Sequence, residues 1–466
     1  MSDIKFGTDG WRAIIARDFT TANVARVAEA TALWQLAVHK SPSVIIGYDC
    51  RFGGELFTDV VARVLCSKGI KVYVAGSFVS TPMISLAARD LRCGAGIIIT
   101  ASHNPASYNG YKLKSGYGGP STPDEIQKVE SLIPETTVIP EKTLADFSSE
   151  GLLEWVDLES MYFDKVDHYF DLKGIRNSGI RIAYDSMFGS GQNMFYRIFP
   201  EAIHLHHDHN PSFHGQAPEP LEKNLQELAD IIKKDGHIDC GIATDGDADR
   251  LGMFDEKGRF VDSHHLILLL IHYLKKYKQQ DGKVVVAFSA TDKVKKLCHH
   301  YGLECVVTKI GFKYIAELMI KDDVLLGGEE SGGIAVKGHL PERDGIWNAL
   351  VILEFMTHTG KKLSELVDEV YKIVGAFNYS RNDLHLDEAQ KKAVIERCAS
   401  GAYSRFGAFE ILETESIDGF KFHLPEESWV MVRPSGTEPV LRIYAQGKDE
   451  TNVKAILKQT KETLLG

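Results

Sequence analysis

Short apolar runs alternate with longer amphipathic stretches along most of the chain. Runs of β-branched and aliphatic residues, such as Val44-Ile-Ile-Gly-Tyr48 and Ala95-Gly-Ile-Ile-Ile99, are typical of strands buried in a parallel sheet. Between such runs, apolar residues recur every three or four positions, a spacing that predicts helices, as at Leu221, Leu225, Leu228 and Ile232. Strands that alternate with helices in this way indicate βαβ units.

The order of strands and loops repeats three times. In each repeat, two strands precede a third that ends in a polar loop, and these loops begin at Thr100, Thr244 and Gly327. The C-terminal part changes character, with a helix expected over 386–398, strands near 409–412, 429–432 and 441–445, and a last helix from Glu450. The predicted fold class is therefore α/β, with three tandem similar α/β domains with mixed sheets and a C-terminal α+β domain. The expected domain limits are 1–150, 151–256, 257–371 and 372–466.

Composition and charge exclude several classes of protein. The chain has 466 residues and a net charge of −11, which argues against a nucleic-acid partner, whose phosphates would need a basic surface. No apolar run approaches the roughly 20 residues needed to cross a bilayer, and the N-terminus lacks the pattern of a signal peptide. The seven cysteines are scattered without C-x-x-C pairing, which indicates reduced thiols and a cytoplasmic location.

Ser102 is the best-presented candidate nucleophile. Residues Thr100-Ala-Ser-His-Asn-Pro105 directly follow the predicted strand over 95–99, so Ser102 is expected at the carboxyl edge of a parallel sheet, where open α/β sheets bind ligands. We expect it to be the only hydroxyl beside both this edge and the acidic loop described next. The alternative is that Asn104-Pro105 simply makes a turn.

A second loop carries the carboxylates Asp245, Asp247 and Asp249 at alternate positions. Such spacing in a tight loop directs carboxylates at one hard cation, and three of them can hold Mg²⁺ while leaving positions for phosphate oxygens. An EF-hand is disfavoured because its sixth position requires glycine, and Arg250 stands there. A solvated acidic turn remains the other alternative.

Two glycine-containing loops complete the set of candidates. Residues 327–333 place Glu329, Glu330 and Ser331 among four glycines, a combination suited to binding sugar hydroxyls. Residues 433–439 offer an Arg fork, hydroxyls and backbone N–H groups for a phosphate. Either could instead be an ordinary turn. A histidine-rich segment is not expected to bind metal, because two of its members alternate along a strand before a loop that enters a helix at Leu221; its members are His204, His206, His207, His209 and His214.

Taken together, the four loops TASHNP, DGDADR, GEESGG and RPSGTEP resemble those of the α-D-phosphohexomutase family over essentially the whole chain. The GEESGG loop, the Gly311-Phe-Lys313 stretch and the FGTDGWR opening are most similar to the phosphoglucomutase/phosphomannomutase type. Phosphoglucosamine mutases typically have Gln and His where Glu330 and Gly333 stand. The resemblance implies a heart-shaped, four-domain molecule in which each domain contributes one loop to a central cleft.

The resemblance also implies roles for individual residues. Ser102 would be the phosphoserine and would hold Mg²⁺ together with Asp245, Asp247 and Asp249. The other catalytic candidates are Lys112, Arg12, Arg250 and His103, with Lys112 and Arg12 considered for general acid/base work. The expected substrate-binding residues are Lys313, Glu329, Ser331, Arg433, Ser435, Gly436 and Thr437.

The expected protein is thus a cytoplasmic, Mg²⁺-dependent phosphohexomutase. It would interconvert hexose 1- and 6-phosphates through a phosphoserine and a hexose 1,6-bisphosphate, with glucose as the expected sugar, mannose as a further one and glucose 1,6-bisphosphate as activator. Its partners would be small-molecule sugar phosphates, with no nucleic acid or membrane, and it would be a monomer or homodimer. Alternatives are a phosphomannomutase, a phosphoglucosamine mutase, a non-catalytic sugar-phosphate sensor and a phosphatase that hydrolyses its own phosphoserine.

Overall fold

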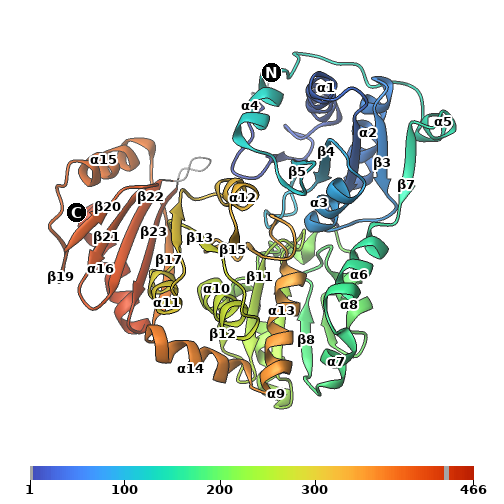
Figure 1. Cartoon of the computed structure of the whole chain (residues 1–466). Helices are drawn as coiled ribbons and strands as arrows, with labels where there is room; N and C mark the ends of the chain where they lie inside the picture. Colours follow the sequence, from blue (N-terminus) through green and yellow to red (C-terminus); the bar gives the residue numbers. More distant parts are fainter. Residues whose placement is uncertain (1–3, 435–439) are drawn as a thin grey trace. The chain divides into compact units, whose positions relative to one another are not determined.

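The computed structural model describes residues 4–434 and 440–466 (Figure 1). Its strands form four main sheets and one two-stranded pair. Within this described part, no helix is both long enough and apolar enough to cross a membrane.

Contacts divide the chain into two compact units. The first contains Met1–Val285 and Gly311–Val367, and the second contains Val286–Ile310 and Asp368–Gly466. The first two sheets lie wholly within the first unit and the C-terminal sheet lies wholly within the second.

The first sheet has seven strands in the order β1-β5-β4-β2-β3-β7, with β6 paired to β5. It is mixed, because β2 runs parallel to β3 and β4 whereas β5 is antiparallel to β4 and β1. The bounds are β1 Trp11–Ile14, β2 Ser43–Tyr48, β3 Lys71–Ala75, β4 Ala95–Ile99, β5 Tyr108–Ser115, β6 Gly119–Pro120 and β7 Leu153–Val156. The helices are α1 Thr21–Val38, α2 Gly54–Ser67, α3 Thr81–Asp90, α4 Pro123–Ser131 and α5 Leu144–Ser149. All five residues of β4 are buried, as expected for a central strand.

The second sheet has the order β12-β11-β10-β8-β9. Its bounds are β8 Ile182–Asp185, β9 Ile203–Leu205, β10 Cys240–Thr244, β11 Leu251–Asp255 and β12 Phe260–Val261, and the helices are α6 Leu158–Tyr169, α7 Leu172–Asn177, α8 Gln192–Ile198 and α9 Gln226–Asp235. β10 is parallel to β8 and antiparallel to β11, so the acidic loop between β10 and β11 is a hairpin connection at the carboxyl end of β10.

One predicted helix start in this domain is wrong. The apolar spacing from Leu221 suggested a helix beginning there, but Leu221 has an extended backbone and a 3₁₀ turn over Glu222–Asn224 follows it. The helix α9 begins only at Gln226. Pro218 and Pro220 disfavour helical backbone at the residues before them, Ala217 and Glu219, so the chain enters Leu221 in a non-helical conformation. Leu225 is nevertheless fully buried, so its apolar character reflects core packing.

The third sheet has the order β14-β13-β15-β16. Its bounds are β13 Lys283–Ala287, β14 Cys305–Thr308, β15 Val324–Gly328 and β16 Ile334–Val336. The helices of this part are α10 Ser263–His272, α11 Lys293–Tyr301, α12 Phe312–Lys321, α13 Gly345–Thr359 and α14 Leu363–Val374. A π-helical turn over Tyr273–Tyr277 extends α10.

The C-terminal sheet is antiparallel, in the order β17-β23-β22-β21-β20. Its bounds are β17 Asn378–His385, β20 Glu413–Glu415, β21 Phe420–Leu424, β22 Ser428–Pro434 and β23 Val440–Gly447, with a separate pair β18 Arg405–Phe406 and β19 Phe409–Glu410. The helices α15 Glu388–Ala399 and α16 Glu450–Leu465 complete the domain. The predicted class of three α/β parts followed by an α+β domain is confirmed.

Candidate active site

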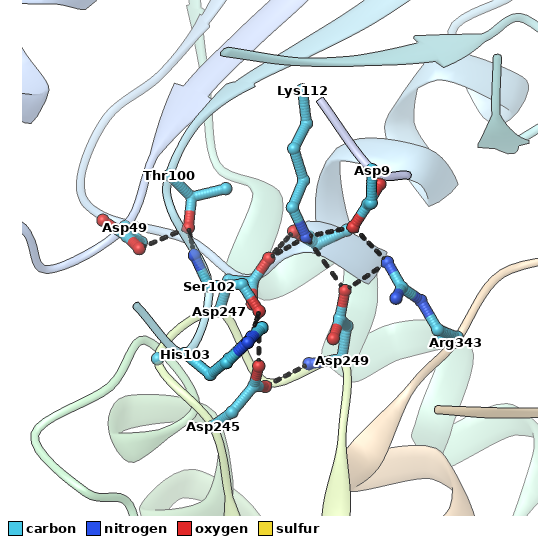
Figure 2. Close-up of polar contacts among 12 residues, drawn as sticks. Asp9, Asp49, Thr100, Ser102, His103, Lys112, Asp245, Asp247, Asp249 and Arg343 are labelled. Atoms are coloured by element: carbon cyan, nitrogen blue, oxygen red, sulfur yellow. Dashed lines mark hydrogen bonds and ion pairs between the residues drawn. The ribbon is translucent and has the colours of Figure 1, made fainter. Parts of the chain in front are cut away.

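Ser102 lies just beyond the carboxyl end of β4 and is 1 % exposed. Its backbone has a φ of 52°, a left-handed conformation that is uncommon for a residue other than glycine. The Ser102 hydroxyl donates a hydrogen bond of 2.7 Å to Asp245 Oδ2, and it lies 3.4 Å from His103 Nδ1 (Figure 2). The structure therefore brings the predicted nucleophile to the predicted acidic loop.

A buried arginine supports the loop that carries Ser102. The Arg51 guanidinium, with a fully buried side chain, donates hydrogen bonds to the backbone carbonyls of Asn104, Pro105 and Tyr108 at 2.6, 2.9 and 3.1 Å. It also bonds to the carbonyl of Ser102. By binding four carbonyls between Ser102 and Tyr108, Arg51 holds this loop in place. Sequence reasoning did not find this residue.

The three aspartates of the β10–β11 loop form a metal-binding arrangement. Asp245, Asp247 and Asp249 are fully buried, and one oxygen from each lies within 4.8 Å of the others. Asp247 Oδ1 and Asp249 Oδ1 are buried without a hydrogen-bond partner. Buried oxygens in that state are costly unless a cation binds them, so the donor set fits a hard cation. Among the described residues, this is the one such group of His, Cys, Asp and Glu side chains.

Lys112 balances part of the negative charge of the aspartates. It lies on β5 with a fully buried side chain, and its Nζ is 2.6 Å from Asp247 Oδ2, 3.0 Å from Asp249 Oδ2 and 2.7 Å from Asp9 Oδ2. Burial alone would lower the pKa of Lys112, but these carboxylates outweigh it and raise the pKa, so the ammonium is charged. Asp9 can approach β5 because Gly10, with a φ of +91°, has no Cβ to meet the Tyr111 carbonyl.

Arg343 joins the third domain to this cluster (Figure 2). It lies just before α13, is 4 % exposed, and places Nη2 2.7 Å from Asp249 Oδ2 while also pairing with Asp9. Burial alone would raise the pKa of Asp9, but the positive charges of Arg343 and Lys112 outweigh it. The pKa of Asp9 is therefore well below its usual range. Gly333 makes room for Arg343, because a Cβ there would meet Arg343 Cδ at 2.3 Å. Neither Asp9 nor Arg343 was predicted as a site residue.

The pKa values of two of the aspartates are shifted in opposite directions. Burial, followed by repulsion from Asp247 and Asp249, raises the pKa of Asp245 well above its usual range. Burial would raise the pKa of Asp247 as well, but Lys112 and the Thr81 hydroxyl lower it. Thr81, the first residue of α3, donates its hydroxyl to Asp247 Oδ2. A second hydroxyl, that of Thr81, therefore contacts the acidic loop in addition to that of Ser102.

The remaining catalytic candidates surround the Ser102 loop. Arg12 Nη1 donates to Asn104 Oδ1 at 2.7 Å, and Arg250 Nε lies 3.9 Å from Asp245 Oδ2. Burial, followed by the charges of Arg250 and Arg12, lowers the pKa of His103 well below its usual range, so its imidazole is neutral.

Glu329 follows the end of β15 and is 6 % exposed. It accepts a 3.0 Å hydrogen bond from the Gly311 N–H, at the start of α12. Burial raises the pKa of Glu329 to about 7, although Arg343 and Arg250 oppose the shift. Ser331 is part-buried two residues further on, and the Lys313 ammonium lies over the Tyr314 ring. Of these candidates, Glu329 and Lys313 therefore lie at the start of α12.

The candidates of the fourth domain are only partly described. Arg433, near the end of β22, donates from Nε to Asp418 Oδ1 at 3.1 Å. Ser435, Gly436 and Thr437 lie outside the described residues.

Four models of phosphoglucomutase/phosphomannomutase domains match the chain in order. They are domain I at residues 3–138, domain II at 160–258, domain III at 262–374 and the C-terminal domain at 385–463. The chain belongs to the α-D-phosphohexomutase family. Its members are mutases, that is, intramolecular phosphotransferases, and this chain is one of them.

Individual relatives carry different names. A Methanothermobacter thermautotrophicus protein named as a probable phosphoglucosamine mutase is 31% identical, covering 98% of this chain and 96% of its own length. A phosphoglucomutase/phosphomannomutase of Thermococcus kodakarensis is 28% identical, covering 97% and 96% respectively. Among solved structures, a Thermus thermophilus protein provisionally named a phosphomannomutase superimposes with a TM-score of 0.88 at 33% identity, covering 100% of both chains. This phosphohexomutase is therefore similar to enzymes named for more than one sugar.

Proposed function

We propose that this phosphohexomutase interconverts glucose 1-phosphate and glucose 6-phosphate through a phosphoserine at position 102. The observation that carries the proposal is the contact between the Ser102 hydroxyl and Asp245, inside a buried cluster whose carboxylates Lys112 and Arg343 partly neutralise. Phosphoryl transfer depends mainly on positioning and on neutralising charge, and this cluster supplies both.

Asp245, Asp247 and Asp249, together with an oxygen at Ser102, would hold Mg²⁺. The ion would supply Lewis-acid stabilisation of the phosphoryl oxygens. The protein's own groups do the rest in this proposal: Arg250 and Arg12 flank the Ser102 loop and would bind phosphoryl oxygens. Lys112, Arg12 and His103 are the candidates for moving protons. A neutral His103 lies 3.4 Å from the Ser102 oxygen and can accept a proton, whereas the raised pKa of Lys112 means that its ammonium holds its proton tightly and mainly neutralises the aspartates.

A single phosphoserine that serves two carbon positions requires a hexose 1,6-bisphosphate that turns end over end. Only sugar hydroxyls placed similarly in both orientations, at C3 and C4, can be bound by one fixed pair of groups, and Glu329 and Ser331 are proposed for them. Lys313 would also contact the substrate. Arg433, with Ser435, Gly436 and Thr437, is proposed to bind the phosphate that is not being transferred. Glucose 1,6-bisphosphate would then act as an activator by rephosphorylating Ser102.

Glucosamine 1-phosphate is the second candidate substrate, because relatives that are 31% identical over nearly the whole chain are named for it. Against it stands Gly333, where phosphoglucosamine mutases typically have His. A side chain at this position would collide with Arg343, which pairs with Asp249. Mannose 1-phosphate is expected to react more slowly than glucose 1-phosphate, since Glu329 and Ser331 would largely ignore C2.

The direct test supplies glucose, mannose and glucosamine 1-phosphates in parallel with Mg²⁺ and compares kcat/KM. We expect the highest value for glucose. A higher value for glucosamine would overturn the choice of sugar and leave the mutase intact. Release of inorganic phosphate in place of the 6-phosphate would indicate a phosphatase, and tight binding without turnover would indicate a sensor.

Three further expectations stay predictions. They are domain limits near residues 150, 256 and 371, a cytoplasmic location, and a monomeric or homodimeric state. Limited proteolysis tests the domain limits, cell fractionation tests the location, and analytical sedimentation tests the oligomeric state.

A further inference from the structure

Asp49 is a buried carboxylate beside the Ser102 loop that has no part in the proposed chemistry. It directly follows β2, and its side chain is fully buried. Its backbone N–H donates to the carbonyl of Ile99, the last residue of β4, at 3.1 Å, so the end of β2 is fixed beside the strand that leads to Ser102. A buried carboxylate is costly unless other groups bind it, and the groups that bind Asp49 connect it to Ser102 in two ways.

The first connection runs through Thr100 to the Ser102 N–H (Figure 2). The Thr100 hydroxyl donates its proton to Asp49 Oδ2, and the same hydroxyl oxygen accepts the Ser102 N–H at 2.9 Å. An ionised carboxylate can only accept hydrogen bonds, so Thr100 must donate to Asp49, and its oxygen remains available to accept the Ser102 N–H. Asp49 thereby sets the direction of both hydrogen bonds.

The second connection runs through Arg51 to the Ser102 carbonyl. Asp49 Oδ1 accepts the Arg51 backbone N–H at 2.9 Å, and Asp49 Oδ2 lies 3.3 Å from Arg51 Nε. The Arg51 guanidinium in turn donates to the carbonyls of Ser102 and Asn104. Both the N–H and the carbonyl of Ser102 are therefore bound by side chains that contact Asp49.

We propose that Asp49 is a positioning residue for phosphoryl transfer at Ser102. Through its two partners it holds the Ser102 backbone at a φ of 52°, and in this conformation the Ser102 hydroxyl lies 2.7 Å from Asp245 Oδ2. A reacting atom displaced by about 1 Å can lose on the order of 10²-fold in rate. The fully buried Asp49 side chain does not reach the substrate, so its loss should slow the transfer and leave substrate binding unchanged. This inference rests on the proposed phosphoserine.

Three variants and one control test the connection to the Ser102 N–H. Asp49→Asn keeps the shape of the side chain but can donate to Thr100, so it no longer sets the direction of the two hydrogen bonds. Thr100→Val removes the hydroxyl at nearly constant volume, whereas Thr100→Ser retains it. Thr58→Val is the matched control, because Thr58 is buried in α2 and its hydroxyl has no hydrogen-bond partner.

Phosphorylation of Ser102 by glucose 1,6-bisphosphate is followed by rapid quenching and mass spectrometry, and kcat and KM are measured for glucose 1-phosphate. Asp49→Asn and Thr100→Val should each lower kcat and the phosphorylation rate by at least about tenfold, while KM stays within about twofold of the wild type. Thr100→Ser should recover to within about threefold of the wild type, and Thr58→Val should match it. The double variant of Asp49→Asn and Thr100→Val should lose little more than either single variant, because both act through the same hydrogen bonds.

Circular dichroism establishes that each variant is folded, and if Asp49→Asn does not fold, the comparison of Thr100→Val with Thr100→Ser decides. Wild-type rates in the folded Asp49→Asn or Thr100→Val variant would overturn the positioning role. An equal loss in Thr100→Val and Thr100→Ser, or a raised KM with unchanged kcat, would overturn it as well. A wild-type protein that accepts no phosphoryl group at Ser102 would refute the phosphoserine itself, and this inference with it.

Discussion

Replacing Glu329 with Gln should make the protein more stable at alkaline pH. The pKa of Glu329 is raised from 4.5 to about 7 by burial, so the folded state binds this proton more tightly than the unfolded state does. The stability associated with the proton is fully present below the unfolded pKa and is lost as the pH rises through about 7. A shift of this size corresponds to roughly 3 kcal/mol.

The Gln side chain is neutral at every pH and can still accept the hydrogen bond from the Gly311 N–H at 3.0 Å. We therefore expect the free energy of unfolding of the wild type to fall by up to about 3 kcal/mol between pH 5 and pH 8, relative to Glu329→Gln. The substrate-free proteins are unfolded with urea at both values, and the transition of the larger unit is compared. Glu141→Gln, at an exposed position, is the matched control and should follow the wild type.

The same variant should lose activity, because a neutral amide binds sugar hydroxyls less strongly than a carboxylate does. If Glu329→Gln is more stable but has a lower kcat/KM, the buried carboxylate of Glu329 destabilises the folded protein and contributes to substrate binding. If wild type and Glu329→Gln change equally in stability between the two pH values, Glu329 does not titrate near neutrality and this explanation of its burial is wrong.

Three other variants test the buried aspartate cluster and the proposed binding site of the phosphate that is not being transferred. Asp247→Asn should raise the Mg²⁺ concentration for half-maximal activity by at least about tenfold, because it removes a buried carboxylate oxygen that has no other partner. Full turnover of the wild type in excess chelator would exclude a role for the metal. Arg343→Ala should lower the free energy of unfolding by about 3–5 kcal/mol, because it removes the buried cation that pairs with Asp9 and Asp249. Arg343→Lys should restore only part of the lost stability. Near-native stability of Arg343→Ala would contradict the geometry. Arg433→Ala should raise KM for both the 1- and the 6-phosphate and make added glucose 1,6-bisphosphate a stronger activator, whereas impairment with one regioisomer alone would contradict the reorientation scheme.

Local patterns in the sequence predicted much of the fold and the centre of the site. The apolar run over 95–99 forms β4, and Ser102 follows it as expected. The carboxylates at alternate positions from Asp245 to Asp249 converge as predicted, because their spacing within one tight loop directs them toward one point. The false helix start at Leu221 shows the limit of periodicity, because the part-buried Leu221 and the buried Leu225 of a turn that follows Pro220 have the same spacing as one face of a helix.

The missed residues share a different property, since each acts through a partner far away in the sequence. Arg343 reaches Asp9 across 334 positions, and Thr81 reaches Asp247 across 166. No local sequence motif predicts such a pair of residues. Asp9 lies inside the FGTDGWR opening that supports the family resemblance, but only the packing of the first and third domains shows that its carboxylate lies beside several cations.

The most direct test of the central claim is the mass of the tryptic peptide 93–112, which contains Ser102, before and after a chase with substrate. Protein incubated with glucose 1,6-bisphosphate should carry one phosphoryl group on Ser102, and excess glucose 1-phosphate should remove it. Ser102→Ala should carry none and should lose on the order of 4 kcal/mol or more of transition-state stabilisation. A phosphoryl group found on Thr81 instead, or near-native turnover by Ser102→Ala, would contradict the account.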